Sequence, residues 1–165
     1  MATNAHLTMR LLVNETVAAG ATGISVPTLV HDTYKTETDL TSSTTPAITK
    51  VASFLTTLSG GAATIDLTAL TNSGDTAGGS LDLTGLKVQA IYFETTSGDS
   101  AITITTGASN GYNLGGDASF SYKLAGGESC MFSWNETSQN VATADATIDL
   151  AGTGTDSIQC VLVAG

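Results

Sequence analysis

Basic side chains are scarce in this sequence. The 165 residues include five Lys and Arg against fifteen Asp and Glu, which gives a formal net charge of −10. A nucleic-acid-binding surface needs a basic face to displace counterions from phosphates, and an anionic membrane surface attracts the same kind of face. We therefore expect neither nucleic acid nor a membrane as a partner, and we interpret the acidity as a source of solubility.

Histidine is also scarce, which restricts the chemistry. Only His6 and His31 could act as a base near neutral pH. We identify no grouping of Ser, Asp and His of the kind that hydrolases use, and we expect no enzymatic activity, no catalytic residue and no cofactor. No Asp-rich calcium loop occurs, so we expect no metal site. Four aspartates near the ends of expected strands are interpreted as turn-capping residues: Asp66, Asp82, Asp149 and Asp156.

Cysteine occurs twice, at Cys130 and Cys160, without His or Cys partners at zinc-binding spacing. Both fall on expected inward strand faces and could form a disulfide if their strands are neighbours. Residues Met1 to Arg10 do not read as a secretory signal, and no apolar run approaches the roughly 20 residues of a membrane helix. We therefore expect synthesis in a cytoplasm and two reduced, buried thiols.

Alternating apolar and polar residues dominate the rest of the chain. In the stretch from Leu81 to Thr106 two such segments flank a turn cluster at residues 97–100, which predicts a half-buried antiparallel strand pair. From Thr49 onward we expect about eight short strands with turn signals roughly every 8 to 12 residues, a spacing typical of a sandwich or barrel. The predicted fold class is therefore an all-β, antiparallel β-sandwich.

Two segments are harder to assign. Residues 48–58 fit a helical stripe, but their β-branched threonines favour a strand, and we favour a hairpin with the strand pattern that follows. The polar segment from Lys35 to Thr45 is interpreted as a long surface loop or mobile arm. We place an N-terminal arm and extension at residues 1–48 and the sandwich body at residues 49–165.

Two local patterns bear on the interior of the body. Trp134 lies in phase with Cys130 and Phe132, so we expect it to pack in the core rather than at a binding surface. The pentapeptide Ala-Thr-Ile-Asp-Leu occurs at residues 63–67 and again at residues 146–150. Because no fixed period follows, we interpret the recurrence as a common solution for a strand that meets a turn, not as an internal repeat.

The body resembles small virion proteins of tailed bacteriophages, of the head-decoration (cement) or minor capsid type. Four segments carry the resemblance: GGAATIDLTAL at residues 60–70, LTGLKVQAI at 83–91, TGASNGY at 106–112 and IDLAGTGTDS at 148–157, the last followed by a terminal strand. The resemblance spans Thr49 to Gly165 and excludes residues 1–48. It implies a jelly-roll-like sandwich, a homotrimer on a capsid surface, the major capsid protein as partner, and no enzymatic activity.

The N-terminal stretch is the candidate attachment element of such a protein. His6 and Arg10 are among the few cationic groups, and Leu7 and Met9 have strand spacing suited to pairing with a neighbour's exposed edge. We name His6, Leu7, Met9 and Arg10 as candidate capsid contacts. The alternative is that this segment is the first strand of the sandwich. The alternative function is a glycan- or receptor-binding β-sandwich module on a fibre or cell surface.

Overall fold

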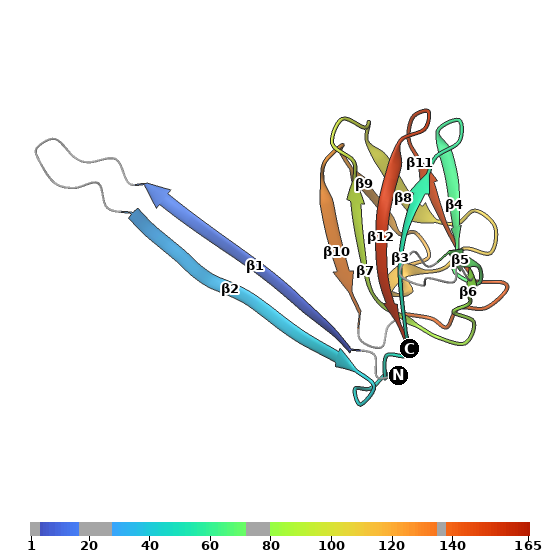
Figure 1. Cartoon of the computed structure of the whole chain (residues 1–165), viewed down its shortest axis with the longest axis horizontal. Coiled ribbons are helices and arrows are strands. Elements are labelled where there is room, and N and C mark those ends of the chain that lie inside the picture. The colour runs from blue at the N-terminus through green and yellow to red at the C-terminus, as the bar shows by residue number, and fades with distance from the viewer. Residues whose placement is uncertain (1–3, 17–27, 72–79, 135–137) are drawn as a thin grey trace, which may run out of the picture.

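The computed structural model divides the chain into a β-sandwich body and a two-stranded arm that projects from it (Figure 1). The structure describes residues 4–16, 28–71, 80–134 and 138–165, and it describes residues 10–16 and 28–34 by their backbone alone. Two four-stranded antiparallel sheets form the body. The prediction of an all-β antiparallel sandwich is therefore confirmed.

The two sheets of the body draw their strands from both halves of the sequence. The first sheet has the order β10 (Ser129–Ser133), β7 (Val88–Thr95), β12 (Ser157–Ala164) and β3 (Lys50–Thr57). The second sheet has the order β4 (Ala62–Asp66), β11 (Thr147–Ala151), β8 (Ile102–Thr106) and β9 (Ser121–Leu124). A short pair, β5 (Leu70–Thr71) and β6 (Ser80–Leu81), and one 3-10 turn, η1 (Leu114–Gly116), complete the described body.

The pairing of these strands is nested. β3 pairs with β12 and β4 with β11, while β7 pairs with β10 and β8 with β9. Consecutive strands such as β7 and β8, or β3 and β4, lie in different sheets. The predicted strand pair within Leu81 to Thr106 is therefore wrong, and so is the hairpin after residue 48, although both segments contain strands. Alternation reports which face of a strand is buried, and it does not identify the neighbouring strand.

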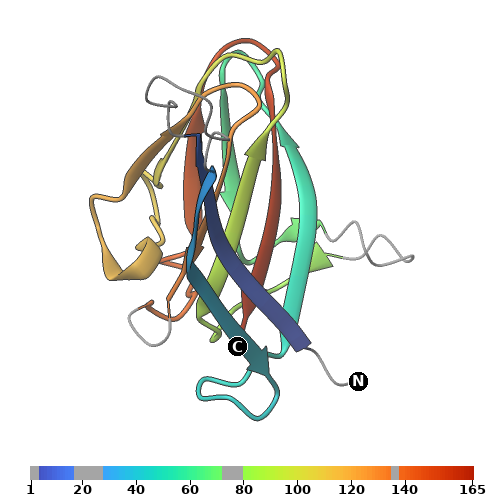
Figure 2. The ribbon, with the colours of Figure 1, turned by 90° about the vertical axis from the view of Figure 1, so that its left-hand side faces the viewer.

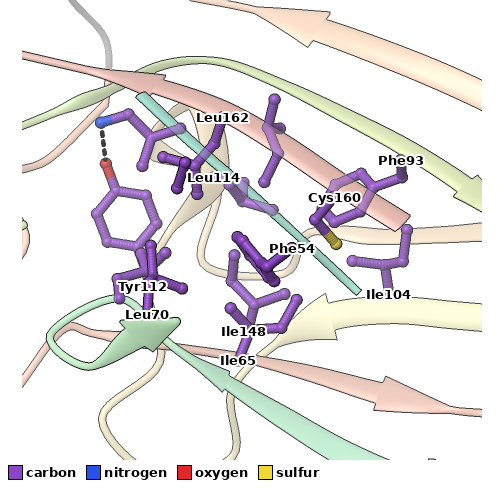
Figure 3. Close-up of a cluster of buried hydrophobic side chains, with 14 of the residues drawn as sticks. Phe54, Ile65, Leu70, Phe93, Ile104, Tyr112, Leu114, Ile148, Cys160 and Leu162 are labelled. Carbon is purple, nitrogen blue, oxygen red and sulfur yellow. Dashed lines mark hydrogen bonds between the residues drawn. The ribbon is translucent and has the colours of Figure 1, made fainter. Parts of the chain in front are cut away.

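The core lies between the inner faces of the two sheets (Figure 3). Phe54, Phe93 and Leu162 of the first sheet meet Ile104 and Ile148 of the second, and all five are buried. Alternation along each strand sends these side chains inward, as expected for a sandwich.

A turn segment that follows β8 adds a polar anchor to this core. Tyr112 is completely buried, and its hydroxyl accepts a hydrogen bond from the Val88 amide (3.0 Å) and donates one to the Gln139 carbonyl (2.8 Å). Burial raises the pKa of this phenol. The side chain thereby ties the start of β7 to the segment before β11.

The recurring pentapeptide has a structural consequence. Its two copies lie in β4 and β11, which pair antiparallel with Ile65 opposite Ile148. This register sets the threonine of each copy opposite the aspartate of the other, and the Thr64 hydroxyl donates a 2.8 Å hydrogen bond to Asp149 Oδ1. The recurrence thus marks a local two-fold pairing between strands about 80 residues apart, a relation that no local sequence pattern reveals.

The two cysteines are separated by a strand. Cys130 of β10 and Cys160 of β12 both lie opposite Phe93, on either side of β7. Strands two positions apart in a sheet are about 10 Å apart, beyond the reach of a disulfide. Both thiols are free, with Cys160 buried and Cys130 partly buried, and burial raises the pKa of Cys130 to about 11. Burial also raises the pKa of Cys160 well above its ordinary value, so neither thiol is an activated nucleophile.

Candidate functional site

The arm is a long antiparallel hairpin made of β1 (Asn4–Thr16) and β2 (Thr28–Thr41). Its register runs from Asn4 opposite Thr41 to Thr16 opposite Thr28, with one irregularity between Leu11 and Val13. Lys35 to Thr45 was expected to be a surface loop or an arm; residues 35–41 belong to β2 of the arm, so the loop alternative is wrong for them. The segment is polar because most of it is exposed, and its threonines suit a strand.

Hydrophobic contacts at its base fix the arm to the outer face of the first sheet. Leu7 and Leu40 are buried against Ile48, Ala90 and Val163. Figure 2 looks onto this sheet, with the arm in front of it. β1 belongs to neither sheet of the body, so the interpretation of this segment as the first sandwich strand is wrong.

The middle of β7 is buried on both faces, and the arm base covers it on the outer face at Ala90. Val88, Ala90 and Ile91 and the intervening Gln89 are all buried. Alternation alone had predicted one solvated face for this strand. The apolar Val163 of the neighbouring strand β12 is covered in the same way.

The four predicted contact residues do not form one surface. All lie in β1, where alternation sends Leu7 and Met9 to one face and His6 to the other. Leu7 is used in the contact with the chain's own body, whereas Met9 is 51% exposed. Arg10 lies opposite Lys35 in the register, and its side chain is outside the described set.

A small charge cluster occupies the polar face at the arm base. His6 Nδ1 lies 2.5 Å from Asp39 Oδ1, and Lys35 Nζ lies 2.6 Å from Glu37 Oε1. The hydrogen bond and the charge of Asp39 raise the pKa of His6, with a smaller contribution from Glu37. Because all four groups are well exposed, such pairs contribute little to stability.

Two cavities open where the arm meets the body. The smaller, about 270 Å³, is largely apolar and lies between Ala5 and Leu7 of the arm and Val161 and Met131 of the first sheet. The larger, about 460 Å³, lies between the end of β2, the turn after it and the end of β10, and we call it the Trp134 cavity. Its lining consists of Thr38, Asp39, Leu40, Thr44, Thr45, Ser133 and Trp134.

Trp134 belongs to an aromatic row along the edge strands β9 and β10. Its ring stacks on Phe132 (centroids 5.7 Å apart, interplanar angle 7°), and Phe132 meets Phe120 and Tyr122 edge to face. Trp134 packs against the core but is only partly buried, so the expectation of core packing is met in part. The cavity was missed from sequence because its two walls are roughly 90 residues apart in the chain, which no local pattern reveals.

The carboxylates of the body hold turns together, as predicted. Asp66 and Asp82 each accept hydrogen bonds from the amide and hydroxyl two residues later, which lowers the pKa of Asp82. Asp149 accepts a bond from the Ala108 amide, and Asp156 accepts one from the Ser100 amide. Among the described residues, no group of three or more His, Cys, Asp or Glu side chains could hold a metal ion.

One segment of the body matches the amino-acid pattern of a hydrolase motif. Residues 107–111, GASNG, fit Gly-x-Ser-x-Gly, which in hydrolases forms a sharp turn between a strand and a helix. Here the segment follows β8 but leads to no α-helix, and its nearest helical element is the 3-10 turn η1. His6 is bonded to Asp39 on the arm, and the side chain of His31 is outside the described set. The described geometry therefore assembles no triad at Ser109.

Comparisons with protein-family models, with curated proteins and with solved structures found no match for this chain. Among the described residues, no helix is both long and apolar enough to cross a lipid bilayer.

Proposed function

We propose that this protein is a structural virion protein that binds the outside of a phage capsid and uses its hairpin arm for attachment. The observation that carries the proposal is the projecting arm, a two-stranded element whose described side chains contact the body at its base (Figure 1). An isolated two-stranded hairpin is marginally stable in water, so a long one is best explained by a partner surface on which it packs.

The body suits the role of a stable outer module. We assign it to the jelly-roll type, because the nested pairing of β3 with β12, β4 with β11, β7 with β10 and β8 with β9 is that of two interlocked Greek keys. Turns capped by aspartates and free, protonated thiols require no cofactor or oxidising environment. A structural role fits these features better than catalysis does.

Charge separates the arm from the body. Residues 1–48 contain two basic and four acidic residues, whereas residues 49–165 contain three and eleven. An acidic body resists non-specific association, and the less acidic arm meets the smallest repulsion when it approaches another protein. We propose the major capsid protein as this partner and a homotrimer as the unit that docks, because several weak arm contacts then act together.

The test is binding to purified virions by proteins altered in the arm. Deleting residues 1–41 removes both strands and leaves no unpaired β2, so the body should remain folded and binding should be lost. Met9→Asp places a charge on the exposed apolar face of the arm and should weaken binding. Leu55→Asp is the matched control, because Leu55 is 59% exposed on the body.

Retained virion binding by the folded deletion variant would contradict the arm as attachment element. Loss of binding by Leu55→Asp but not by Met9→Asp would instead place the contact on the first sheet.

Quantitative mass spectrometry of purified particles addresses the role itself, because hundreds of copies per particle favour decoration. A few copies per particle would favour the alternative, a glycan- or receptor-binding module. Light scattering tests the trimer, which a strict monomer both in solution and on the particle would exclude.

A further inference from the structure

We propose that the Trp134 cavity binds a neutral saccharide. Its volume of about 460 Å³ lies within the range of ligand sites, roughly 300 to 1,000 Å³. It combines one aromatic wall with several hydroxyl groups and a single charged side chain. This combination is what a sugar requires, because a pyranose ring has an apolar C–H face and a rim of hydroxyls.

The aromatic wall is held in a fixed orientation. The Phe132 ring lies parallel to the indole with the ring centroids 5.7 Å apart, and the backbone of Gly115 packs closely over the indole at Nε1. A Cβ at Gly115 would fall 2.2 Å from Trp134 Nε1, and this glycine also has a φ of +63°, so a side chain is excluded there on two grounds. Contacts with Phe132 and Gly115 therefore order the indole before a ligand binds, and Trp134 presents a pre-ordered wall to the cavity.

The polar rim offers both donors and acceptors. Asp39 accepts hydrogen bonds through its carboxylate, and His6 Nδ1 lies 2.5 Å from one of its oxygens, which leaves the other oxygen for a ligand. Thr38, Thr45 and Ser133 are exposed and carry hydroxyls that can donate or accept. Thr44 has a structural role instead, because its hydroxyl donates to the carbonyls of Thr41 and Pro46.

The charge of the rim decides the class of saccharide. Asp39 is the one charged residue among those that line the cavity, and a carboxylate repels the carboxylate of a sialic or uronic acid. Neutral hexose units therefore fit the site better than acidic ones. The inference rests on the cavity alone, so it stands or fails separately from attachment of the arm to a capsid.

The chain supplies its own reporter, because Trp134 is its single tryptophan. We would titrate the full-length protein with lactose, maltose, cellobiose and mannobiose and follow tryptophan emission. A saturable change in emission is expected with at least one of these neutral disaccharides, and a weaker response is expected with sialyllactose. The absence of any saturable change at tens of millimolar of every neutral disaccharide would overturn the proposal, as would tighter binding of sialyllactose.

Two variants locate the site. Asp39→Asn and Thr45→Val should each weaken binding roughly fivefold to tenfold, the equivalent of one hydrogen bond. Thr103→Val, on β8 of the second sheet, is the matched control and should bind like the unaltered protein. Circular dichroism melting verifies that each variant is folded. If both cavity variants bind as tightly as the control, the saccharide binds elsewhere and the assignment is wrong.

Discussion

The arm and the body are both built from antiparallel strands, but different interactions hold them together. The body encloses a core between two sheets, in which side chains such as Phe93 and Ile148 are completely buried. The described residues of the arm form a single two-stranded layer, and their side chains beyond the base are exposed. Strand pairing alone is therefore not what stabilises this protein, and the arm depends on the body at its base.

The largest difference between the two regions should appear when an apolar side chain is removed from each. Phe93→Ala empties a completely buried site and should lower the free energy of unfolding by about 3–5 kcal/mol. Met9→Ala, at a side chain that is 51% exposed, should change it by less than about 0.5 kcal/mol. Chemical denaturation measures both values. Similar losses would mean that the arm carries as much stability as the core.

Polar groups should show the same contrast on a smaller scale. Tyr112→Phe leaves the buried amide of Val88 and the carbonyl of Gln139 without their hydroxyl partner, which should cost about 1–3 kcal/mol. Tyr122→Phe is the control, because Tyr122 is 40% exposed and water can replace any contact of its hydroxyl. Equal melting temperatures for the two variants would indicate that the Tyr112 hydrogen bonds do not stabilise the fold.

The two cysteines test how much packing around the free thiols contributes to the stability of the body. The double variant Cys130→Ala, Cys160→Ala should lose about 1–3 kcal/mol of stability through reduced packing. Reductant alone should have no effect on the unaltered protein, because β7 separates the two thiols. A mobility shift on non-reducing gels, or unfolding caused by reductant, would refute the assignment of two free thiols.

The smallest effect concerns the pH dependence of the arm base. Asp39 raises the pKa of His6 in the folded state. The His6–Asp39 attraction is therefore fully present below the unfolded pKa of about 6.5 and is lost as the pH rises through the higher folded value. NMR titration of the His6 ring should give a pKa above that of a free histidine, and Asp39→Asn should return it toward the ordinary value. An unshifted His6 in the unaltered protein would show that the contact does not form in solution.

Sequence patterns predicted the positions of the body strands and the turn-capping role of its aspartates better than they predicted which strands pair. Alternation located β7 and β8, and the positions of Asp66 and Asp156 indicated turn capping, because both signals act within a few residues. Neighbouring strands were assigned wrongly, since β3 meets β12 across about 100 residues.

The arm and the Trp134 cavity also depend on contacts between residues far apart in the chain, which local sequence patterns do not predict. Lys35 to Thr41 lacks the apolar alternation of a half-buried strand, because within these residues Leu40 alone is buried. Met9 and Leu7 were rightly placed on one strand face, but the internal role of Leu7 depends on Ala90 and Val163, far along the chain. Trp134 was expected in the core because its phase matches Cys130, and nothing in its neighbourhood in sequence indicates Asp39.

The nested pairing also sets the order in which this chain can fold as it leaves the ribosome. β12 lies between β7 and β3, and β11 lies between β4 and β8, so these two strands, which follow all their partners in the sequence, occupy interior positions of both sheets. Until residues 147–164 have emerged, neither sheet can close, whereas the arm register from Asn4 to Thr41 is complete early. Contacts this distant in sequence slow folding, and the nascent chain exposes unpaired edges of β3 and β4 throughout synthesis.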